Sequence, residues 1–278
     1  MVVHMAKLGR GILKFLIVIL LIIDLYPIFW LVLSSFKSDP EFIKPMYALP
    51  EGIYWQNYVV AIERAHLGTL FRNTLVVTVI SIVFVWLFSA TAAFAVTKMK
   101  WKGSKLALVY ITMGMFIPAF VLLLPQFLLL QQTHMLNSLV GLIVVFTCTS
   151  IPMAFYLLTG FYKYLPDEIL EASVIDGCDI YRCYAQIVIP LSLNGVVTVI
   201  LLTFVNIWND LLISQTFVSS NENKMLQVGL VSFIDDRGNR EWGPTFALIC
   251  AAIVPTLALY LILNRKIIDG LSAGAVKG

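Results

Sequence analysis

The sequence predicts an all-α integral membrane protein with six transmembrane helices. The chain has 278 residues, of which 60% are hydrophobic and only 13% are charged, and its mean hydropathy is +0.90. A soluble domain carries about 25% charged residues, so most of this apolar surface belongs in lipid. The apolar stretches are continuous, whereas a membrane barrel alternates apolar and polar residues in segments of about ten. Lipid therefore forces helices, in which every backbone group bonds within its own segment.

Six apolar stretches are long enough to cross the roughly 30 Å hydrocarbon layer of a bilayer. The first follows three basic residues, as a signal peptide does, but it continues without a small-residue cleavage site and is expected to be retained. Pro118, Pro125 and Pro255 predict kinks in the third and sixth stretches. We expect one transmembrane domain over residues 1–278, with spans near residues 12–34, 69–97, 106–130, 138–160, 193–217 and 245–264.

The basic residues predict that both termini lie in the cytoplasm. With that orientation, twelve of the 19 Lys and Arg residues fall inside and the other seven outside. The short segment KMKWKGSK at residues 98–105 gives the clearest signal, because positive charge in short loops is retained inside. The outside then holds two polar segments, residues 35–68 and 218–244, and the longest cytoplasmic loop covers residues 161–190.

Composition and motifs exclude several classes of function. A net charge of +3, without a basic run interleaved with aromatics, argues against nucleic-acid binding. The four cysteines lack the neighbouring Cys or His residues of a metal site and do not resemble a disulfide framework. The sequence has no G-x-x-x-x-G-K-[ST] phosphate loop and no H-E-x-x-H motif. We therefore expect no catalytic residue, no metal and no cofactor bound by this chain.

The loop at residues 161–190 contains YLPDEILEASVIDG, which predicts a short helix. Pro166 suits the first helical position, Asp167 and Glu168 favour the positive end of the helix dipole, and Gly177 suits the C-terminal stop. A second short helix is expected to end at Pro190, after a start near residue 180.

Local physics leaves the role of the first short helix open. A helix of roughly ten residues is marginal by itself in water. Its apolar residues, Ile169, Leu170, Val174 and Ile175, lie on several sides, which implies a contact surface besides the membrane. The alternative is that the helix packs only on its own loop and on the membrane surface.

The same loop resembles a motif of the binding-protein-dependent ABC importer permeases. These proteins carry E-A-A, then Gly, then Ile-x-Leu-Pro at fixed spacing. The chain departs from this pattern at Ser173, in place of the second Ala, and at Ile189, in place of Leu. The segments YPIFWLVLSSFK, NYVVAI, FRNTL, NIWNDLL and RKIIDGLSAGAVKG are similar to the second permease subunit of carbohydrate importers, so the resemblance covers nearly the whole chain. The matching motif residues are Glu171, Ala172, Gly177, Ile187 and Pro190.

This resemblance implies a permease fold in which the loop forms a coupling helix that docks on a separate ATPase. It implies several partners: a second homologous permease, an ATPase dimer that binds ATP and magnesium, an extracytoplasmic solute-binding protein, membrane lipid and a sugar substrate. It also implies a location in a bacterial or archaeal cytoplasmic membrane. The resemblance assigns ATPase coupling to Glu168, Glu171, Ala172, Ser173, Asp176, Gly177, Ile187 and Pro190.

Polar residues at membrane depth are candidates for the solute path, because they are expensive to bury in lipid. In the fifth span, Thr203, Asn206, Asp210 and Ser214 recur at helical spacing and share one face, with Asn209 alongside. Amide and carboxylate groups bond hydroxyls, and an indole stacks on a sugar face. Trp208 is the candidate for that stacking. The alternatives are bonds between helices, apolar packing of the indole, and a solute held mainly by the partner permease.

The leading hypothesis is the membrane subunit of an ATP-driven sugar importer, and the alternative is a self-contained ion-coupled secondary transporter. The alternative needs inverted repeats and intramembrane acids with partners. Asp24 and Asp210 alone support it only weakly. The substrate stays open between saccharides and glycerol phosphates. Lys224, Arg237 and Arg240 fit either an anionic solute or a surface for the acidic lobes of a binding protein.

Overall fold

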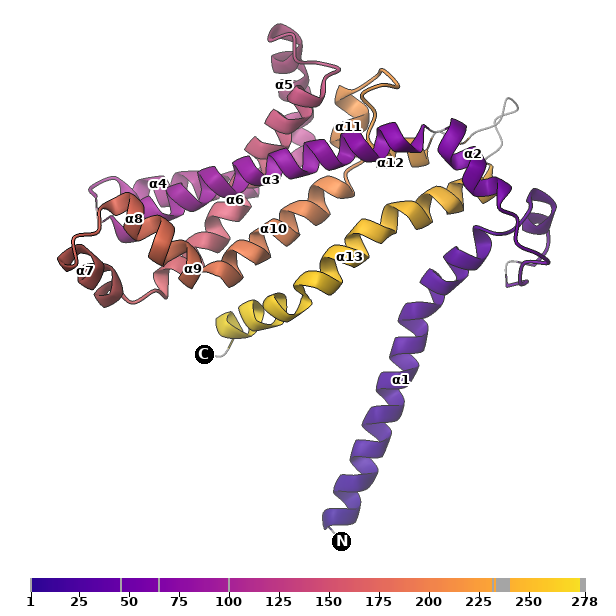
Figure 1. Cartoon of the computed structure of the whole chain (residues 1–278), viewed down its shortest axis with the longest axis horizontal. Coiled ribbons are helices and arrows are strands. Elements are labelled where there is room, and N and C mark those ends of the chain that lie inside the picture. Colours follow the sequence, from indigo (N-terminus) through magenta and orange to yellow (C-terminus); the bar gives the residue numbers. More distant parts are fainter. Residues whose placement is uncertain are drawn as a thin grey trace. The chain divides into compact units, whose positions relative to one another are not determined.

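The computed structural model describes residues 2–45, 47–64, 66–99, 101–231, 233 and 241–275, and these residues form helices joined by short loops (Figure 1). The predicted all-α class is confirmed. The helices are α1 Val2–Ser34, η1 Asp39–Ile43, α2 Gln56–Arg64, α3 Leu67–Lys98, α4 Ser104–Met113, η2 Gly114–Phe116, α5 Ala119–Gln132, α6 Leu139–Lys163, α7 Asp167–Ile175, α8 Ile180–Cys183, η3 Tyr184–Val188, α9 Ile189–Leu191, α10 Leu193–Trp208, α11 Leu212–Phe217, α12 Leu226–Leu230 and α13 Trp242–Ala275.

Among the described residues, four helices are by themselves long and apolar enough to span a membrane. They cover Gly11–Ser34, Leu67–Lys98, Leu139–Lys163 and Trp242–Leu263. Two further candidates are bent pairs, Ser104–Phe116 with Ala119–Gln132 and Ile180–Leu191 with Leu193–Trp208. Counting each pair as one span gives six, the number that the sequence predicts.

The third predicted span, residues 106–130, is two helices rather than one kinked helix. The segments on either side of Pro118 meet at 99°. Ile117 has an extended backbone (φ −84°, ψ 115°), and Pro118 follows as the N-cap of α5. Proline lacks the N–H that would continue a helix and disfavours helical geometry in the residue before it. The kink predicted at Pro118 is therefore a break between two helices. Pro125 and Pro255 lie inside α5 and α13.

The fifth predicted span, residues 193–217, is also interrupted, which corrects the continuous helix expected there. Helix α10 ends at Trp208, and α11 begins at Leu212. The amide of Asn209 donates to the carbonyl of Val205 at 2.9 Å, and the carboxylate of Asp210 accepts the N–H of Ser214 at 2.9 Å. Such local bonds from Asn and Asp side chains compete with the helical ladder and start a new turn.

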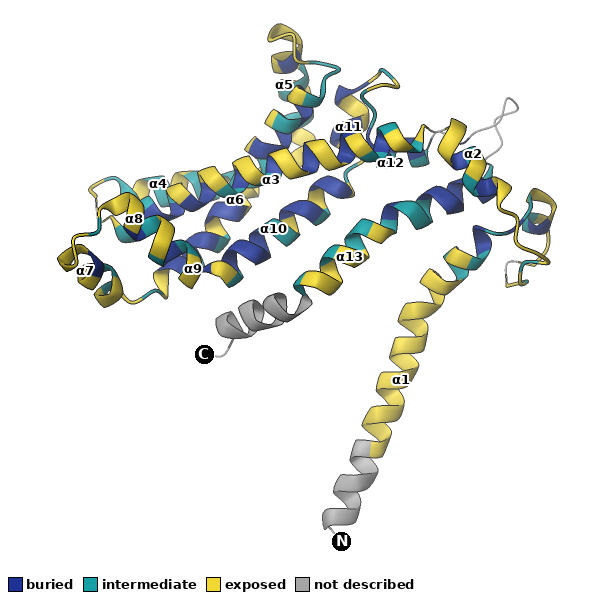
Figure 2. Cartoon of the chain, in the orientation of Figure 1, coloured by how far each residue is buried: buried dark blue, intermediate teal, exposed yellow. Residues whose placement is uncertain are grey.

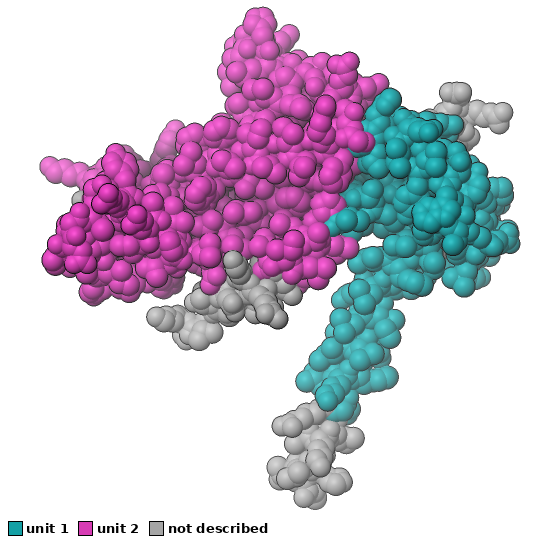
Figure 3. All heavy atoms as spheres, in the orientation of Figure 1, with its two compact units in different colours: residues 1–67, 229–254 teal, residues 68–228, 255–278 magenta. Residues whose placement is uncertain are grey.

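The described residues form two compact units (Figure 3). The first comprises Met1–Leu67 and Gly229–Val254, and the second comprises Gly68–Val228 and Pro255–Gly278. In the first unit, the ring of Phe246 contacts those of Trp30, Phe42 and Trp242 at centroid distances of 5.3, 5.7 and 5.9 Å. Helix α1 is exposed from residue 11 to residue 29 (Figure 2), which agrees with its assignment as a candidate membrane span.

The second unit has two buried apolar clusters. One gathers Val85, Phe94, Phe155, Leu158 and Val196 with their neighbours on α3, α6 and α10. The other gathers residues of α3, α5, α6, α10 and α11, among them Val77, Leu142, Phe146, Ile207 and Phe217. Helix α6 contacts α10, α4, α5 and α11, and is therefore the central helix of this unit.

Two buried asparagines tie loops to helices. The amide nitrogen of Asn57 in α2 donates to the carbonyls of Ser35 and Lys37 at 2.9 and 2.8 Å. The amide nitrogen of Asn73 in α3 donates to two carbonyls of the segment before α12, at 2.7 and 3.1 Å. These residues belong to NYVVAI and FRNTL, two of the segments that carry the family resemblance. The structure assigns both asparagines a loop-fixing role.

Candidate functional site

Helix α7 occupies the middle of the 161–190 loop. Asp167 and Glu168 form its first turn, as the sequence predicts. Pro166 is the N-cap, with ψ 131°, rather than the first helical residue, which corrects the predicted position by one residue. An N-cap has extended backbone geometry, which proline adopts readily, and the missing N–H costs nothing at the start of a helix.

Gly177 ends α7, as predicted. Its φ of +83° lies in the left-handed region that L-residues avoid. The N–H of Gly177 donates to the carbonyl of Val174, and the N–H of Cys178 donates to that of Ser173, both at 3.0 Å. This pair of bonds is the Schellman motif, which satisfies the last carbonyls of a helix.

The second short helix runs from Ile180 to Leu191, one residue beyond Pro190, and includes a π-helical turn, η3. It starts where the carboxylate of Asp179 accepts the N–H of Arg182 at 2.8 Å. Ile187 is half-buried in η3, and Pro190 is exposed in α9.

Both ends of α7 are tied to neighbouring elements of the second unit. At the start, the ammonium of Lys98 in α3 contacts the Asp167 carboxylate at 2.7 Å and the Leu165 carbonyl at 2.6 Å. Near the end, the buried hydroxyl of Ser173 lies 3.3 Å from the thiol of Cys183 in α8. Ser173 therefore faces inward, and a small residue is needed there.

The opposite side of α7 is uncovered. Glu171 and Ala172 are exposed, and the side chains of Val174 and Ile175 are 62% and 85% exposed. Tyr181 in α8 is 82% exposed. Val174 and Ile175 thus form an exposed apolar surface on a helix that is held at both ends. Among the remaining predicted coupling residues, Glu168 and Asp176 are exposed as well.

A cavity of about 200 Å³ lies between α6 and α10 in the second unit. Thr203, Asn206 and Asp210 line it, so the structure brings three of the predicted path residues together. Its apolar walls include Ala154 of one core cluster and Phe146 of the other. The cavity therefore lies between the two apolar clusters.

The other three predicted path residues do not line this cavity. Trp208 is fully buried against Phe204, at a centroid distance of 5.2 Å, so its indole packs on apolar neighbours. Asn209 is exposed at the end of α10. Ser214 is buried, and its hydroxyl donates to the Asp210 carboxylate at 3.0 Å. The broken helix explains the position of Ser214, because the spacing of a continuous helix does not hold beyond Trp208.

The cavity also contains polar residues that sequence reasoning missed. Thr149 and Ser150 of α6 line it opposite α10. The available signal was the run TCTS at residues 147–150, in which small polar residues interrupt an otherwise apolar span. The hydroxyl of Thr149 donates to the carbonyl of Val145 at 2.8 Å, so its oxygen retains the capacity to accept a bond.

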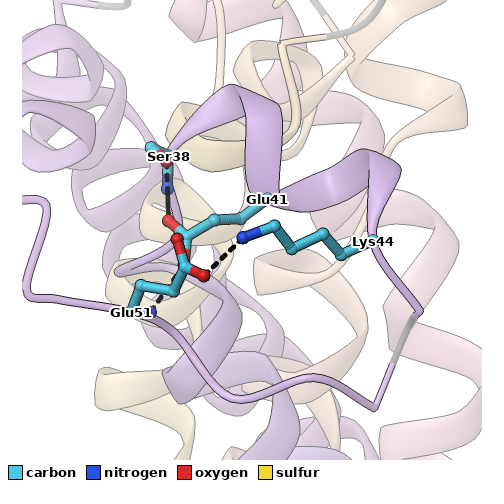
Figure 4. Close-up of polar contacts among 4 residues, drawn as sticks. All are labelled: Ser38, Glu41, Lys44 and Glu51. Atoms are coloured by element: carbon cyan, nitrogen blue, oxygen red, sulfur yellow. Dashed lines mark hydrogen bonds and ion pairs between the residues drawn. The ribbon is translucent and has the colours of Figure 1, made fainter.

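A separate polar cluster lies in the first unit (Figure 4). The Glu41 carboxylate accepts the hydroxyl and N–H of Ser38, at 2.6 and 2.7 Å, and the N–H of Glu51 at 2.6 Å. Lys44 forms an ion pair with Glu51. The Ser38 hydroxyl is the main cause that lowers the pKa of Glu41, which the two N–H groups also lower, against the opposing effect of burial. This network organises the loop between α1 and α2.

Of the basic residues expected outside, Lys224 is half-buried and its ammonium donates to the side chain of Asn221 at 2.7 Å. Arg237 and Arg240 lie outside the described residues. Lys100 and Lys277, counted inside, also lie outside them.

Comparison with known proteins gives a consistent family. Residues 87–267 match the family described as binding-protein-dependent transport system inner membrane component. The diacetylchitobiose uptake system permease protein DasC of Streptomyces coelicolor is 30% identical over 263 residues, which cover 94% of this chain and 95% of that protein. The probable starch degradation products transport system permease protein AmyC of Thermoanaerobacterium thermosulfurigenes is 28% identical over 275 residues, or 99% and 98% of the two chains.

A solved structure shares the fold. It is a bacterial ABC transporter involved in the import of the acidic polysaccharide alginate, and one of its chains superposes with a TM-score of 0.82 at 21% identity. The match covers 93% of this chain and 96% of that one.

The motif of the 161–190 loop, the helical membrane fold and these matches agree. The chain is a multi-pass permease subunit of an ABC importer and is not itself an ATPase. Permeases of this family bind no cofactor, since the nucleotide belongs to the separate ATPase. The chain belongs to the family of binding-protein-dependent transport system inner membrane components.

Proposed function

We propose that this chain is one of two homologous permeases in an ATP-driven importer of sugars or oligosaccharides. The similar permeases DasC and AmyC are named for the uptake of diacetylchitobiose and of starch degradation products, and each aligns with over nine-tenths of this chain. A solute-binding protein outside the membrane delivers the sugar, and an ATPase dimer inside supplies the energy. This division of labour agrees with a chain in which the sequence shows no phosphate loop.

Helix α7 is the element through which the ATPase acts. The observation that carries this assignment is an exposed apolar surface, Val174 and Ile175, on a short helix fixed at both ends. An exposed apolar patch on a rigid element is typical of a protein interface. Closure of the ATPase dimer moves α7 as a lever, and the contact of Asp167 with Lys98 transmits this movement to α3.

The cavity between α6 and α10 is this chain's contribution to the solute path, and the second permease supplies the opposite wall. Asn206 is exposed in the isolated chain although it lies within an apolar helix. A polar side chain at membrane depth avoids lipid and faces protein or water. The bias of basic residues places both termini and the 161–190 loop in the cytoplasm.

The first test is composition. A tagged chain extracted in mild detergent is expected to retain one second permease and a pair of ATPases, counted by native mass spectrometry. A monomer or homodimer that still transports sugar would contradict the proposal. So would uptake that persists when the ATPase is inactivated, which would favour an ion-coupled transporter and direct attention to Asp24 and Asp210.

The second test addresses coupling. Glu171→Lys reverses a charge on the exposed side of α7, and Gly177→Pro removes the backbone geometry that ends it. Both variants are expected to insert normally, while uptake falls relative to ATP hydrolysis. Asn221→Lys, at an exposed position in the segment after α11, is the control and is expected to leave coupling unchanged. Normal uptake in both α7 variants, at normal expression, would exclude α7 as the coupling helix.

A further inference from the structure

The cavity between α6 and α10 carries charge of a single sign. Of the described residues that line it, Asp210 is the one acidic residue and none is basic. Its other polar groups, the hydroxyls of Thr149, Ser150 and Thr203 and the amide of Asn206, are uncharged. The solute path therefore meets hydroxyl and amide groups beside one carboxylate.

Hydrogen-bond donors face both oxygens of the Asp210 carboxylate. Its Oδ1 accepts the N–H and the hydroxyl of Ser214 at 2.9 and 3.0 Å, and its Oδ2 faces the N–H of Ile213 at 3.5 Å. Donors placed in this way offset part of the cost of burying a carboxylate. Asp210 also lines the cavity, so its negative charge acts on whatever enters.

A charged side chain in a half-buried site discriminates strongly between charged and uncharged solutes. Charges about 6 Å apart interact far more strongly in the surroundings of a protein than in bulk water, because the effective dielectric constant is lower. An anionic solute is therefore repelled by Asp210, whereas an uncharged polyhydroxy solute donates its hydroxyls to Asp210 and exchanges hydrogen bonds with Asn206. Thr149 and Ser150 add acceptors and donors on the facing wall.

We propose that Asp210 is a specificity-determining residue that makes this wall of the path select uncharged sugars and reject anionic ones, such as uronates or glycerol phosphates. The inference rests on the proposed function, since it assumes that the cavity lines the path. It assigns Thr149 and Ser150, together with Asn206, as the hydrogen-bonding partners of the sugar.

The test measures the electrostatic potential in the cavity and does not depend on which sugar is carried. Asn206→Cys and Met153→Cys each place a thiol in the cavity lining, from α10 and α6 respectively. The complete importer is treated with an anionic reagent, 2-sulfonatoethyl methanethiosulfonate, or a cationic one, 2-trimethylammonioethyl methanethiosulfonate. Peptide mass spectrometry follows each cysteine separately, so the native cysteines stay in place. Rates are normalised to those of free 2-mercaptoethanol.

Both thiols are expected to react, with the cationic reagent favoured, and Asp210→Asn is expected to reduce this preference by about tenfold. Asn221→Cys, in the exposed segment after α11, is the control, and its preference should not respond to Asp210→Asn. Thiols that react but show no preference, or one unaffected by Asp210→Asn, would overturn the charge inference and leave the importer proposal standing. Thiols that never react would show that the cavity is not part of a wet path, and that part of the proposed function would fall.

Discussion

The ammonium group of Lys98, the last residue of α3, lies 2.7 Å from the carboxylate of Asp167, the first residue of α7. The two side chains differ in their access to solvent, since that of Lys98 is 6% exposed and that of Asp167 is 47% exposed. The same ammonium donates to the carbonyl of Leu165. A largely desolvated cation thus joins the end of α3 to the start of α7.

This asymmetry predicts different costs for the two deletions. Lys98→Met leaves a half-exposed carboxylate that water solvates, so it is expected to reduce the free energy of unfolding by about 1–2 kcal/mol. Asp167→Ala leaves the ammonium buried without its counter-ion and is expected to cost more. Thermal unfolding of both variants and of the double variant measures their interaction energy. Equal costs, or a larger cost for Lys98→Met, would contradict the burial of this cation.

The left-handed backbone at Gly177 predicts that a substitution is tolerated better the more readily the new residue adopts a positive φ. Space is not the constraint, because an added Cβ has no neighbour within 4 Å among the described atoms. Gly177→Ala is expected to destabilise the loop by about 1 kcal/mol and to weaken coupling. Gly177→Asn is expected to do so less, since asparagine visits this region more readily.

Gly160 in α6 provides the matched control, because it also has open space around it but belongs to a helix. Gly160→Ala is expected to be neutral or stabilising. Proteolysis of the loop in the purified importer, and uptake per ATP hydrolysed, report the two effects. If Gly177→Ala and Gly160→Ala behave alike, the positive φ of Gly177 is not a constraint.

Local signals in the sequence were sufficient for α7, because its start and its stop depend on neighbouring residues such as Asp167 and Gly177. Local signals did not predict the end of α10, where polar side chains interrupt a helix within an apolar stretch. Asp210 and Asn209 bond to nearby backbone groups, so α10 ends inside a stretch whose hydropathy predicts a continuous helix. Contacts between residues that are distant in the sequence could not be predicted from local signals either. Lys98 meets Asp167 across 69 positions, and Thr149 joins Asn206 in one cavity only after α6 has packed on α10.

The carboxylate of Glu41 predicts a pH dependence in the loop between α1 and α2. Its donors, chiefly the Ser38 hydroxyl, hold the folded pKa of Glu41 below the ordinary value of 4.5. A carboxyl group whose pKa is lower in the folded than in the unfolded protein stabilises the fold. This stabilisation is fully present above the unfolded pKa and is lost as the pH falls through the folded pKa. We therefore expect protection of this loop against proteolysis to be constant above pH 5 and to fall below pH 4.5.

Glu41→Gln tests the source of this dependence. The amide keeps the size of the side chain but replaces one acceptor oxygen with a donor, facing the N–H groups of Ser38 and Glu51. Protection is expected to be lower at pH 7 and to vary less with pH. Glu63→Gln, at an exposed carboxylate of α2, is the control for a change of charge. If Glu41→Gln retains the full pH dependence, another group is responsible.

At Asn73, removing the hydrogen-bond donor and replacing it with an acceptor are expected to destabilise the protein by different amounts. Its buried amide nitrogen donates to the carbonyls of Glu222 and Lys224, and so fixes the segment before α12 to α3. Asn73→Ala leaves these two carbonyls without this donor and is expected to cost about 1–3 kcal/mol. Asn73→Asp places a carboxylate oxygen against them and is expected to cost more, because the buried charge then faces two acceptors and gains only the Arg72 guanidinium, which lies 3.3 Å from the other oxygen.

The exposed residue Asn221 supplies the control, since Asn221→Asp adds the same charge next to the ammonium of Lys224. It is expected to be neutral or slightly stabilising, as surface ion pairs contribute little. Hydrogen exchange across residues 219–226 of the assembled importer separates the three variants: Asn73→Asp should exchange fastest, then Asn73→Ala, with Asn221→Asp unchanged. Equal exchange in all three would mean that other contacts, such as the N–H of Leu226 with the hydroxyl of Thr74 at 2.8 Å, hold the segment by themselves.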